Sequence, residues 1–239
     1  MRKILLAIAL GMAFTSSLPA LDLSFHGGYT SFAMGDLNRA NASLVGYDAE
    51  PYSQPIQSGF VVGADLCSPL AGAPDWLQVG ARYEYLQSNS AELKNDSGGG
   101  GIGNVDFTDQ AKLNNFLVGC KASAPFALPG LTAGLGAWAG YAYATLDQHS
   151  TQYNSPLQSG LFMGSLLVAE LETSLGYSVG KRIHLDFTGG WRWADAGYLY
   201  DDTHKPLYDA LQIYEMSTNA PVNVDYSGLT AQGSVSYSF

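Results

Sequence analysis

After residue 20 the chain repeats one pattern, in which apolar side chains alternate with small or polar ones over runs of about ten residues. Successive side chains of a β-strand point to opposite faces, so this alternation predicts strands with one apolar face. A tilted strand of about ten residues is also long enough to cross a bilayer. The pattern predicts eight strands, at residues 22–34, 58–67, 77–87, 113–122, 131–145, 163–179, 183–196 and 225–239.

The connections between these strands alternate in length. Three are short and rich in Pro or Gly, with the sequences SPLAGAPD, SAPFALPG and GKR. The other four, residues 35–57, 88–112, 146–162 and 197–224, are long and carry most of the acidic side chains. Short turns on one side and long loops on the other are typical of bacterial outer-membrane barrels. We therefore predict an all-β fold, an eight-stranded antiparallel up-and-down transmembrane β-barrel.

The apolar face of each predicted strand suits either of two closed barrels. In a secreted lipocalin-like barrel the apolar face points inward around a ligand, whereas in a membrane barrel it meets lipid. The opposite faces consist mostly of Gly, Ser, Thr and Ala, which are too small and too weakly charged for an exterior in water. This composition favours the membrane barrel.

Aromatic residues fall near the ends of the apolar faces, as they do where a barrel meets the two membrane interfaces. The sequence therefore predicts two aromatic girdles. The first, towards the long connections, contains Tyr83, Tyr85, Tyr141, Tyr143, Trp191 and Trp193, and the second, towards the short turns, contains Trp76, Tyr177 and Tyr237.

The polar faces carry charges of both signs, which an eight-stranded barrel must bury in a narrow interior. Unpaired buried charges are costly, so we predict a salt-bridge network that plugs the lumen. We expect Arg82 and Glu84 to face Glu170, Glu172 and Arg192 across the lumen, with Asp65, Lys121, His184 and Asp186 nearer the short turns. Interior glycines either make room for these long side chains or leave a narrow acidic channel for small solutes.

Residues 1–20 predict a secretory signal peptide, with a basic start at Arg2 and Lys3, a short apolar run and a small residue at Ala20. Residues 21–239 then form the barrel domain, and no later apolar segment reaches the roughly 18 residues that a membrane helix needs. The formal charge of −10 argues against a nucleic-acid partner. Cys67 and Cys120 are predicted on opposite faces of non-adjacent strands, so we expect no disulfide between them.

The sequence predicts neither an enzyme nor a cofactor or metal site. His149 precedes Ser150 and Thr151, but no acid stands at a spacing that would orient the histidine for catalysis. In the last long connection, PLYDALQIYEM either forms a short helix beginning near Pro206 or is an irregular surface loop.

The last predicted strand ends on Phe239, with Tyr237 two residues before it and alternating apolar residues upstream. This ending resembles the C-terminal strand of bacterial outer-membrane barrels, and the chain after residue 20 resembles their small eight-stranded members of the OmpX, OmpW and OmpA type. The resemblance implies that Tyr237 and Phe239 are the signal read by the barrel assembly machinery. It also implies a location in the outer membrane of a Gram-negative-type bacterium, in contact with membrane lipid.

Three functions remain open on the sequence alone. The first is a structural or surface-interaction role for a monomeric barrel whose loops are available to an extracellular ligand. The second is a narrow channel for small solutes, similar to that of OmpW. The third is a secreted lipocalin-like binder, which differs from the others in the direction that its apolar face takes.

Overall fold

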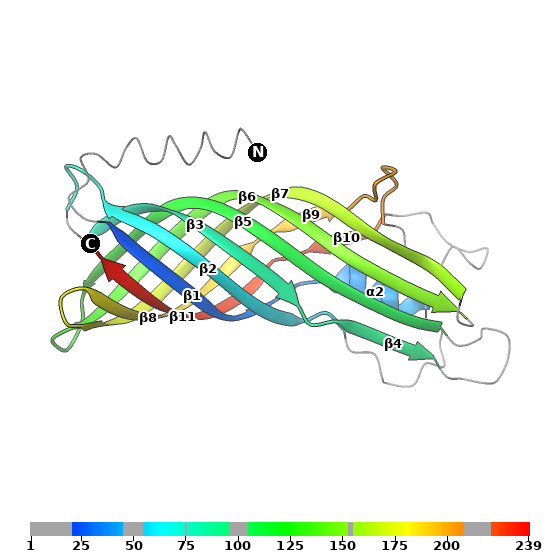
Figure 1. Cartoon of the computed structure of the whole chain (residues 1–239), viewed down its shortest axis with the longest axis horizontal. Helices are drawn as coiled ribbons and strands as arrows, with labels where there is room; N and C mark the ends of the chain where they lie inside the picture. The colour runs from blue at the N-terminus through cyan, green and yellow to red at the C-terminus, as the bar shows by residue number, and fades with distance from the viewer. Residues whose placement is uncertain (1–20, 45–54, 75, 96–104, 153–154, 208–220) are drawn as a thin grey trace.

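The computed structural model describes residues 21–44, 55–74, 76–95, 105–152, 155–207 and 221–239. Eight antiparallel strands form one closed barrel, because β11 pairs with β1 and β3 pairs with β5 (Figure 1). The predicted fold class is confirmed. Around the barrel the strands are β1 (Asp22–Ser31), β2 (Ser58–Pro69), β3 (Leu77–Ser88), β5 (Val105–Pro125), β6 (Leu131–Gln152), β7 (Ser155–Val179), β8 (Ile183–Trp193) and β11 (Gly228–Ser238).

Four shorter elements lie at the end of the barrel opposite the C-terminus (Figure 1). They are α2 (Gly35–Leu44), β4 (Ala91–Asn95), β9 (Asp195–Tyr198) and β10 (Asn223–Asp225). Strand β4 extends the β3 side by pairing with the outer part of β5, and β9 pairs with β10. In the described part of the chain, no helix has the length and apolarity needed to cross a membrane.

The register of the strands fixes the width of the barrel. Pairing runs from Asp22 of β1 through each strand in turn to Gly228 of β11. In the register between β11 and β1, Gly228 lies opposite residue 32, since the Ala33 amide donates to the Ser227 carbonyl oxygen at 2.8 Å. Following the paired residues once around the barrel therefore shifts the position on β1 from residue 22 to residue 32. A shift of this size suits strands tilted by about 35–45° and an interior that side chains can fill.

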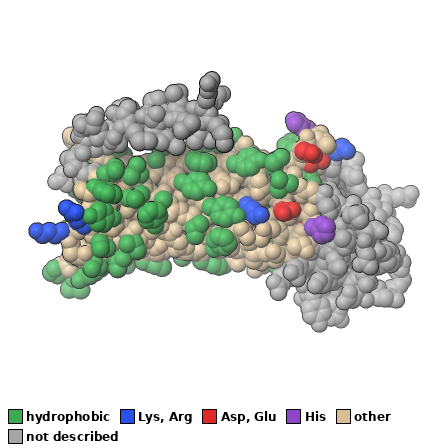
Figure 2. Space-filling model, in the orientation of Figure 1, with side chains coloured by type: hydrophobic (Ala, Val, Ile, Leu, Met, Phe, Trp, Pro, Cys, Tyr) green, Lys and Arg blue, Asp and Glu red, His purple; other side chains and the backbone are tan. Residues whose placement is uncertain are grey.

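The apolar faces of the barrel strands point outward. Leu135, Leu171 and Val235 are 65%, 54% and 53% exposed, whereas Glu170 and Arg192 are buried inside. Figure 2 shows apolar side chains spread over the barrel wall, with charged side chains near its ends. We call this outward apolar surface the belt. A lipocalin-like barrel has the opposite arrangement, so the structure rules out that alternative.

The polarity of the wall reverses along the longest strands. On β6, Leu135 and Tyr143 face outward, and Trp138 is buried inside. Beyond Tyr143 the inward side chain is Leu146, which is fully buried, and the outward one is Asp147, which is exposed. In the belt the apolar residues contact lipid, and beyond it, towards the long connections, they pack against one another inside the barrel. The reversal therefore marks the outer boundary of the membrane-spanning region.

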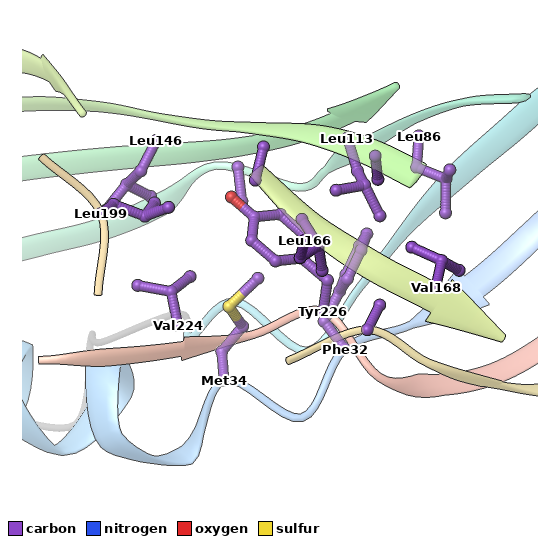
Figure 3. Packing of buried hydrophobic residues seen from close by; sticks show 14 of the residues in the cluster. Phe32, Met34, Leu86, Leu113, Leu146, Leu166, Val168, Leu199, Val224 and Tyr226 are labelled. Carbon is purple, nitrogen blue, oxygen red and sulfur yellow. The ribbon is translucent and has the colours of Figure 1, made fainter. Parts of the chain in front are cut away.

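The part of the barrel above this boundary, which we call the outer section, has a hydrophobic core like that of a water-soluble protein. Figure 3 shows side chains from several strands and from the segment before α2 converging inside it. Met34 and Leu37 bring the start of α2 into this core. Its buried members include Phe32, Met34, Leu37, Leu86, Leu113, Leu146, Phe162, Leu166, Leu199, Val224 and Tyr226.

Three strands are longer than the sequence predicted. Strand β5 begins at Val105, β6 continues to Gln152 and β7 begins at Ser155. Residues 146–162 are therefore mostly strand rather than a long loop, and residues 88–112 include β4 and the start of β5. The prediction stopped early because it required apolar residues on one constant face, whereas the apolar face turns inward in the outer section.

Other boundaries also differ from the prediction. Strand β1 ends at Ser31 because Phe32 and Met34 turn into the outer core, and the connection that follows contains the unpredicted helix α2. Strand β8 ends at Trp193, and β11 begins only at Gly228. The segment PLYDALQIYEM, for which the sequence left a short helix and an irregular loop open, falls largely on residues 208–216, which lie outside the described residues.

Candidate functional site

A double clamp centred on Arg82 lies in the middle of the lumen. Its guanidinium donates to Asp65 through Nε at 2.8 Å and Nη2 at 3.1 Å. It also donates to Glu172 through Nη1 at 2.8 Å and Nη2 at 3.1 Å. These three side chains are almost fully buried, and paired bonds of this type are strong and directional. The clamp therefore ties β2 and β3 to β7 on the opposite wall.

The position of Asp65 differs from the prediction, which placed it nearer the short turns and apart from Arg82. In the β2–β3 register Asp65 lies directly opposite Arg82. A single strand pattern shows which face a residue occupies but does not fix the register between strands. For that reason the sequence indicated that Asp65 is inside without indicating its partner.

Trp138 is a member of the site that was not among the predicted site residues. Its indole Nε1 donates to Glu172 at 2.9 Å, and the Arg82 Cζ atom lies 4.1 Å from its ring centroid. The ring thus supports both partners of one ion pair, by a hydrogen bond and by a cation–π contact. The available signal was its place on the glycine-rich inward face of the strand.

Glu84 is buried beside the clamp, with polar neighbours from three other strands. It accepts from Asn115 Nδ2 at 3.2 Å and from Gln232 Nε2 at 3.3 Å. His26 Nε2 lies 3.2 Å from Glu84, while its Nδ1 lies 3.6 Å from Asp65. Asn115, Gln232 and His26 were not predicted, because neutral or singly placed polar residues look like ordinary lumenal polarity.

Glu170 and Arg192 form the outer edge of this layer. Arg82 Nη1 lies 3.4 Å from Glu170 Oε2, whereas the nearest approach of Arg192 to Glu170 is 4.0 Å. Arg192 instead donates to the Tyr226 carbonyl oxygen at 3.0 Å and to Thr30 Oγ1 at 2.8 Å. Its main structural contacts therefore join the charged layer to the base of the outer section.

The remaining predicted lumenal charges lie closer to the short turns. Lys121 Nζ approaches Asp65 at 4.0 Å, a loose contact for an ion pair. His184 Nε2 lies 3.2 Å from Asp186 and its Nδ1 lies 3.0 Å from Ser178 Oγ. His184 and Asp186 thus form a separate, partly exposed pair and do not join the Arg82 clamp.

Several inward glycines lie beneath these charged side chains. A Cβ atom added at Gly136 would collide with Glu172, and one added at Gly63 would collide with His26. At Gly176 it would meet both His184 and Asp186. The space at these glycines is occupied by neighbouring side chains, which favours the first of the two readings of the interior glycines.

The residues predicted to form aromatic girdles lie on the outside of the barrel, with Tyr85 the least exposed. The Tyr83 ring lies 5.0 Å from the Phe116 ring of the neighbouring strand, and the two ring planes are tilted by 48°. At the other end Tyr237 and Phe239 contact each other edge-on, and the Phe239 amide donates to the Leu21 carbonyl oxygen. Predicted members of the girdles are Trp76, Tyr83, Tyr85, Tyr141, Tyr143, Tyr177, Trp191, Trp193 and Tyr237.

Neither cysteine contributes a bond or a metal site. Cys67 is buried inside the barrel, Cys120 is exposed on the belt, and both are free. Among the described residues, no three His, Cys, Asp or Glu side chains come together in a way that could hold a metal ion.

The fold and this interior define the class of the protein. A closed antiparallel barrel with an apolar outer surface and buried charges inside is a small membrane-spanning β-barrel of the outer-membrane type. Its architecture is that of a barrel that crosses an outer membrane.

Comparisons with solved structures return proteins of low sequence identity. Neisserial surface protein A is 14% identical, with a TM-score of 0.46, covering 92% of this chain and 97% of the other. A major outer membrane protein of Thermus thermophilus is 12% identical, with a TM-score of 0.46 and coverage of 92% and 99%. OprG of Pseudomonas aeruginosa is 11% identical, with a TM-score of 0.40 and coverage of 91% and 95%. No protein-family model and no curated protein sequence matches the chain.

Proposed function

We propose that this protein is a monomeric, non-enzymatic barrel with a closed lumen, which holds its outer section at the cell surface for a structural or interaction role. The observation that carries the proposal is the succession of two filled layers in the barrel interior. The first is the Arg82 clamp with its buried neighbours, and the second is the hydrophobic core of the outer section.

The two layers oppose conduction for different reasons. In the clamp, Arg82, Asp65, Glu172 and Trp138 fill the middle of the lumen and bond to one another, so an ion entering there must displace strong pairs. In the outer section most of the buried inward side chains are apolar, with Asp109 and Gln148 as polar exceptions, and an ion would have to leave water to pass the apolar ones. A solute following the barrel axis meets both layers in turn.

Planar-bilayer recording of the refolded protein tests this proposal against the narrow-channel alternative. We expect no unitary conductance steps from the wild-type protein, from Arg82→Ala or from Glu170→Ala, because the apolar layer remains in all three. Heat-dependent gel mobility shows that each variant is folded. Reproducible conductance steps in the wild-type protein, altered in size by either substitution, would establish the channel and overturn the proposal.

The route to the membrane is part of the same proposal. We propose that residues 1–20 are removed as a signal peptide and that the assembly machinery reads Tyr237 and Phe239 at the end of the final strand. The exposed, mutually contacting rings of these two residues support this role, since they lie at the end of the strand that closes the barrel against β1. Phe239→Ala is expected to lower the amount of folded barrel in outer-membrane fractions without changing its thermal stability once folded.

The extracellular partner is proposed to bind the outer section rather than the belt. The outer section combines its own core with polar outward residues such as Asp147 and His149, so it stands outside lipid as a rigid platform. Rigid platforms that carry loops are a common basis for surface recognition.

A further inference from the structure

The belt contains an open groove of about 590 Å³. This volume lies within the roughly 300–1,000 Å³ of sites that bind small organic ligands. Large side chains form its walls and small ones its floor. The walls include Trp76, Leu135, Leu175 and Phe187, and the floor includes Ala133 and Gly189.

The groove follows from the strand register. Ala133 of β6 pairs with Ala124 of β5, and Thr173 of β7 pairs with Gly189 of β8, so small outward residues stand side by side across the wall. Trp76 closes one side, because its carbonyl oxygen accepts from the Ser123 amide at 2.9 Å and so continues the pairing of β3 with β5. The depression is therefore a fixed property of rigid, paired strands.

Both the position and the lining of the groove indicate an apolar occupant from the bilayer. It lies in the half of the belt next to the short turns, since Ala133 is near the start of β6 and Leu175 near the end of β7. Among the described residues that line it, none is charged. The groove is continuous with the lipid-facing belt, so a chain of membrane lipid can enter it sideways without crossing water.

Two cations stand where the headgroup of such a lipid would lie. Lys181 and Arg182 are exposed in the turn that joins β7 to β8, and these strands supply Leu175 and Phe187 to the groove. Figure 2 shows basic side chains at this end of the barrel. Arg182 is held in place, since it donates to the Tyr237 hydroxyl at 3.0 Å and its carbonyl oxygen accepts from the Ser238 amide.

The separation of these cations from the groove is within the depth of one leaflet. Leu175 lies four residues before the end of β7 at Val179, which is about 13 Å along the strand and about 10 Å along the membrane normal after tilt, and Lys181 lies in the turn just beyond. Half of the roughly 30 Å hydrocarbon core is about 15 Å, which accommodates this separation. We propose that the groove binds an acyl chain of an anionic diacyl phospholipid from the leaflet at the short turns, with its phosphate on Lys181 and Arg182. This inference depends on the membrane orientation but not on a closed lumen.

Native mass spectrometry of the barrel released from equimolar phosphatidylglycerol and phosphatidylethanolamine bilayers tests the proposal. We expect one retained phospholipid per wild-type barrel, with phosphatidylglycerol favoured at least fivefold. Gly189→Leu fills the groove, and its Cβ would come no closer than 3.9 Å to the Thr230 carbonyl oxygen. This variant should retain at least fivefold less lipid. Gly233→Leu is the matched control, because an outward Cβ there meets nothing within 4 Å and Gly233 is not part of the groove.

The headgroup is tested separately with the double variant Lys181→Gln and Arg182→Gln. We expect it to retain lipid but to lose the preference for phosphatidylglycerol. Three results would overturn the proposal: equal retention by Gly189→Leu and the wild type, an unchanged headgroup preference in the double variant, or a lipid-free dimer that Gly189→Leu dissociates. The last result would assign the groove to a second copy of the chain.

Discussion

At the residue scale, the interior is organised by one guanidinium that serves two carboxylates. Arg82 makes paired hydrogen bonds to Asp65 and Glu172, and its guanidinium lies over the Trp138 ring in a cation–π contact. Burying charges is favourable only when such bonds replace the lost hydration, so removal of one partner exposes the full desolvation penalty of the others. Pair geometry, more than the number of charges, therefore determines the contribution of this site to stability.

Arg82→Ala is expected to lower the free energy of unfolding by about 3–5 kcal/mol, because it leaves two buried carboxylates without their main partner. Arg39→Ala is the matched control, since Arg39 pairs with Asp36 on the exposed surface of α2 and should contribute less than about 1 kcal/mol. Urea unfolding in lipid vesicles measures both. Equal losses in the two variants would contradict the role assigned to the clamp.

The composition of the site was more predictable than its pairing. Alternation along a strand assigns Arg82, Asp65 and Glu172 to the inside, because lipid tolerates no charge on the other face. Their pairing depends on the registers of four strand pairs, and the pattern of a single strand does not determine these registers. Trp138 and His26 were missed because their types are equally common as packing residues, and only the three-dimensional arrangement places them beside carboxylates.

At the scale of elements, the apolar side chains of the long strands β5, β6 and β7 change direction along each strand. In the belt their apolar residues face lipid, and in the outer section their apolar residues face the core. The predicted strands are too short because the alternation that lipid imposes stops at the end of the belt, which on β6 lies near Tyr143. The eight strands and the three short turns were predictable because lipid surrounds the membrane-spanning parts of the strands and imposes one apolar/polar alternation on all of them.

Leu146→Ala should lower the free energy of unfolding by about 2–5 kcal/mol, since it opens a cavity in the core of the outer section. Leu167→Ala, at a side chain that is 79% exposed on the belt, should cost less than about 1 kcal/mol. Chemical unfolding of both variants in the same vesicles provides the comparison. A larger loss at Leu167 than at Leu146 would be inconsistent with a packed outer core.

The turn after β9 depends on the ionised form of one carboxylate. Asp201 Oδ1 accepts from the amides of Lys205 and Thr203 and from the Thr203 hydroxyl, each at 2.8 Å. The Lys205 amide is the main cause of a pKa below the ordinary value for Asp201, with the two Thr203 donors adding to it. The stabilisation is therefore complete above an ordinary aspartate pKa of about 3.9 and is lost as pH falls through the lowered value.

A carbon NMR titration should accordingly give Asp201 a midpoint below about 3.9. At neutral pH, Asp201→Asn removes the charge and should speed amide hydrogen exchange at Thr203 and Lys205, while Asp202→Asn serves as the control for an exposed neighbour. A midpoint at or above the ordinary value, or equal exchange in the two variants, would show that the carboxylate does not organise this turn.

At the scale of the whole molecule, the barrel consists of two stacked parts with different surroundings. The membrane-spanning part has buried charges inside and the apolar belt outside. The outer section has the opposite arrangement, with apolar residues inside, as in a water-soluble domain. Continuous strands join the two parts, so the membrane holds the outer section at a fixed height and orientation. This arrangement supports the proposal that the protein presents a surface and does not conduct solutes.

Accessibility of spin labels to oxygen and to a water-soluble nickel chelate tests this orientation most directly. Single cysteines at Leu171 and Asp147, in a background with Cys67 and Cys120 replaced by serine, sample the middle of the belt and the outside of the outer section. In lipid vesicles we predict that the label at residue 171 relaxes with oxygen and not with the chelate, and that the label at residue 147 relaxes with the chelate. A label at residue 171 that is shielded from oxygen, or that the chelate reaches, would contradict an apolar face turned towards lipid.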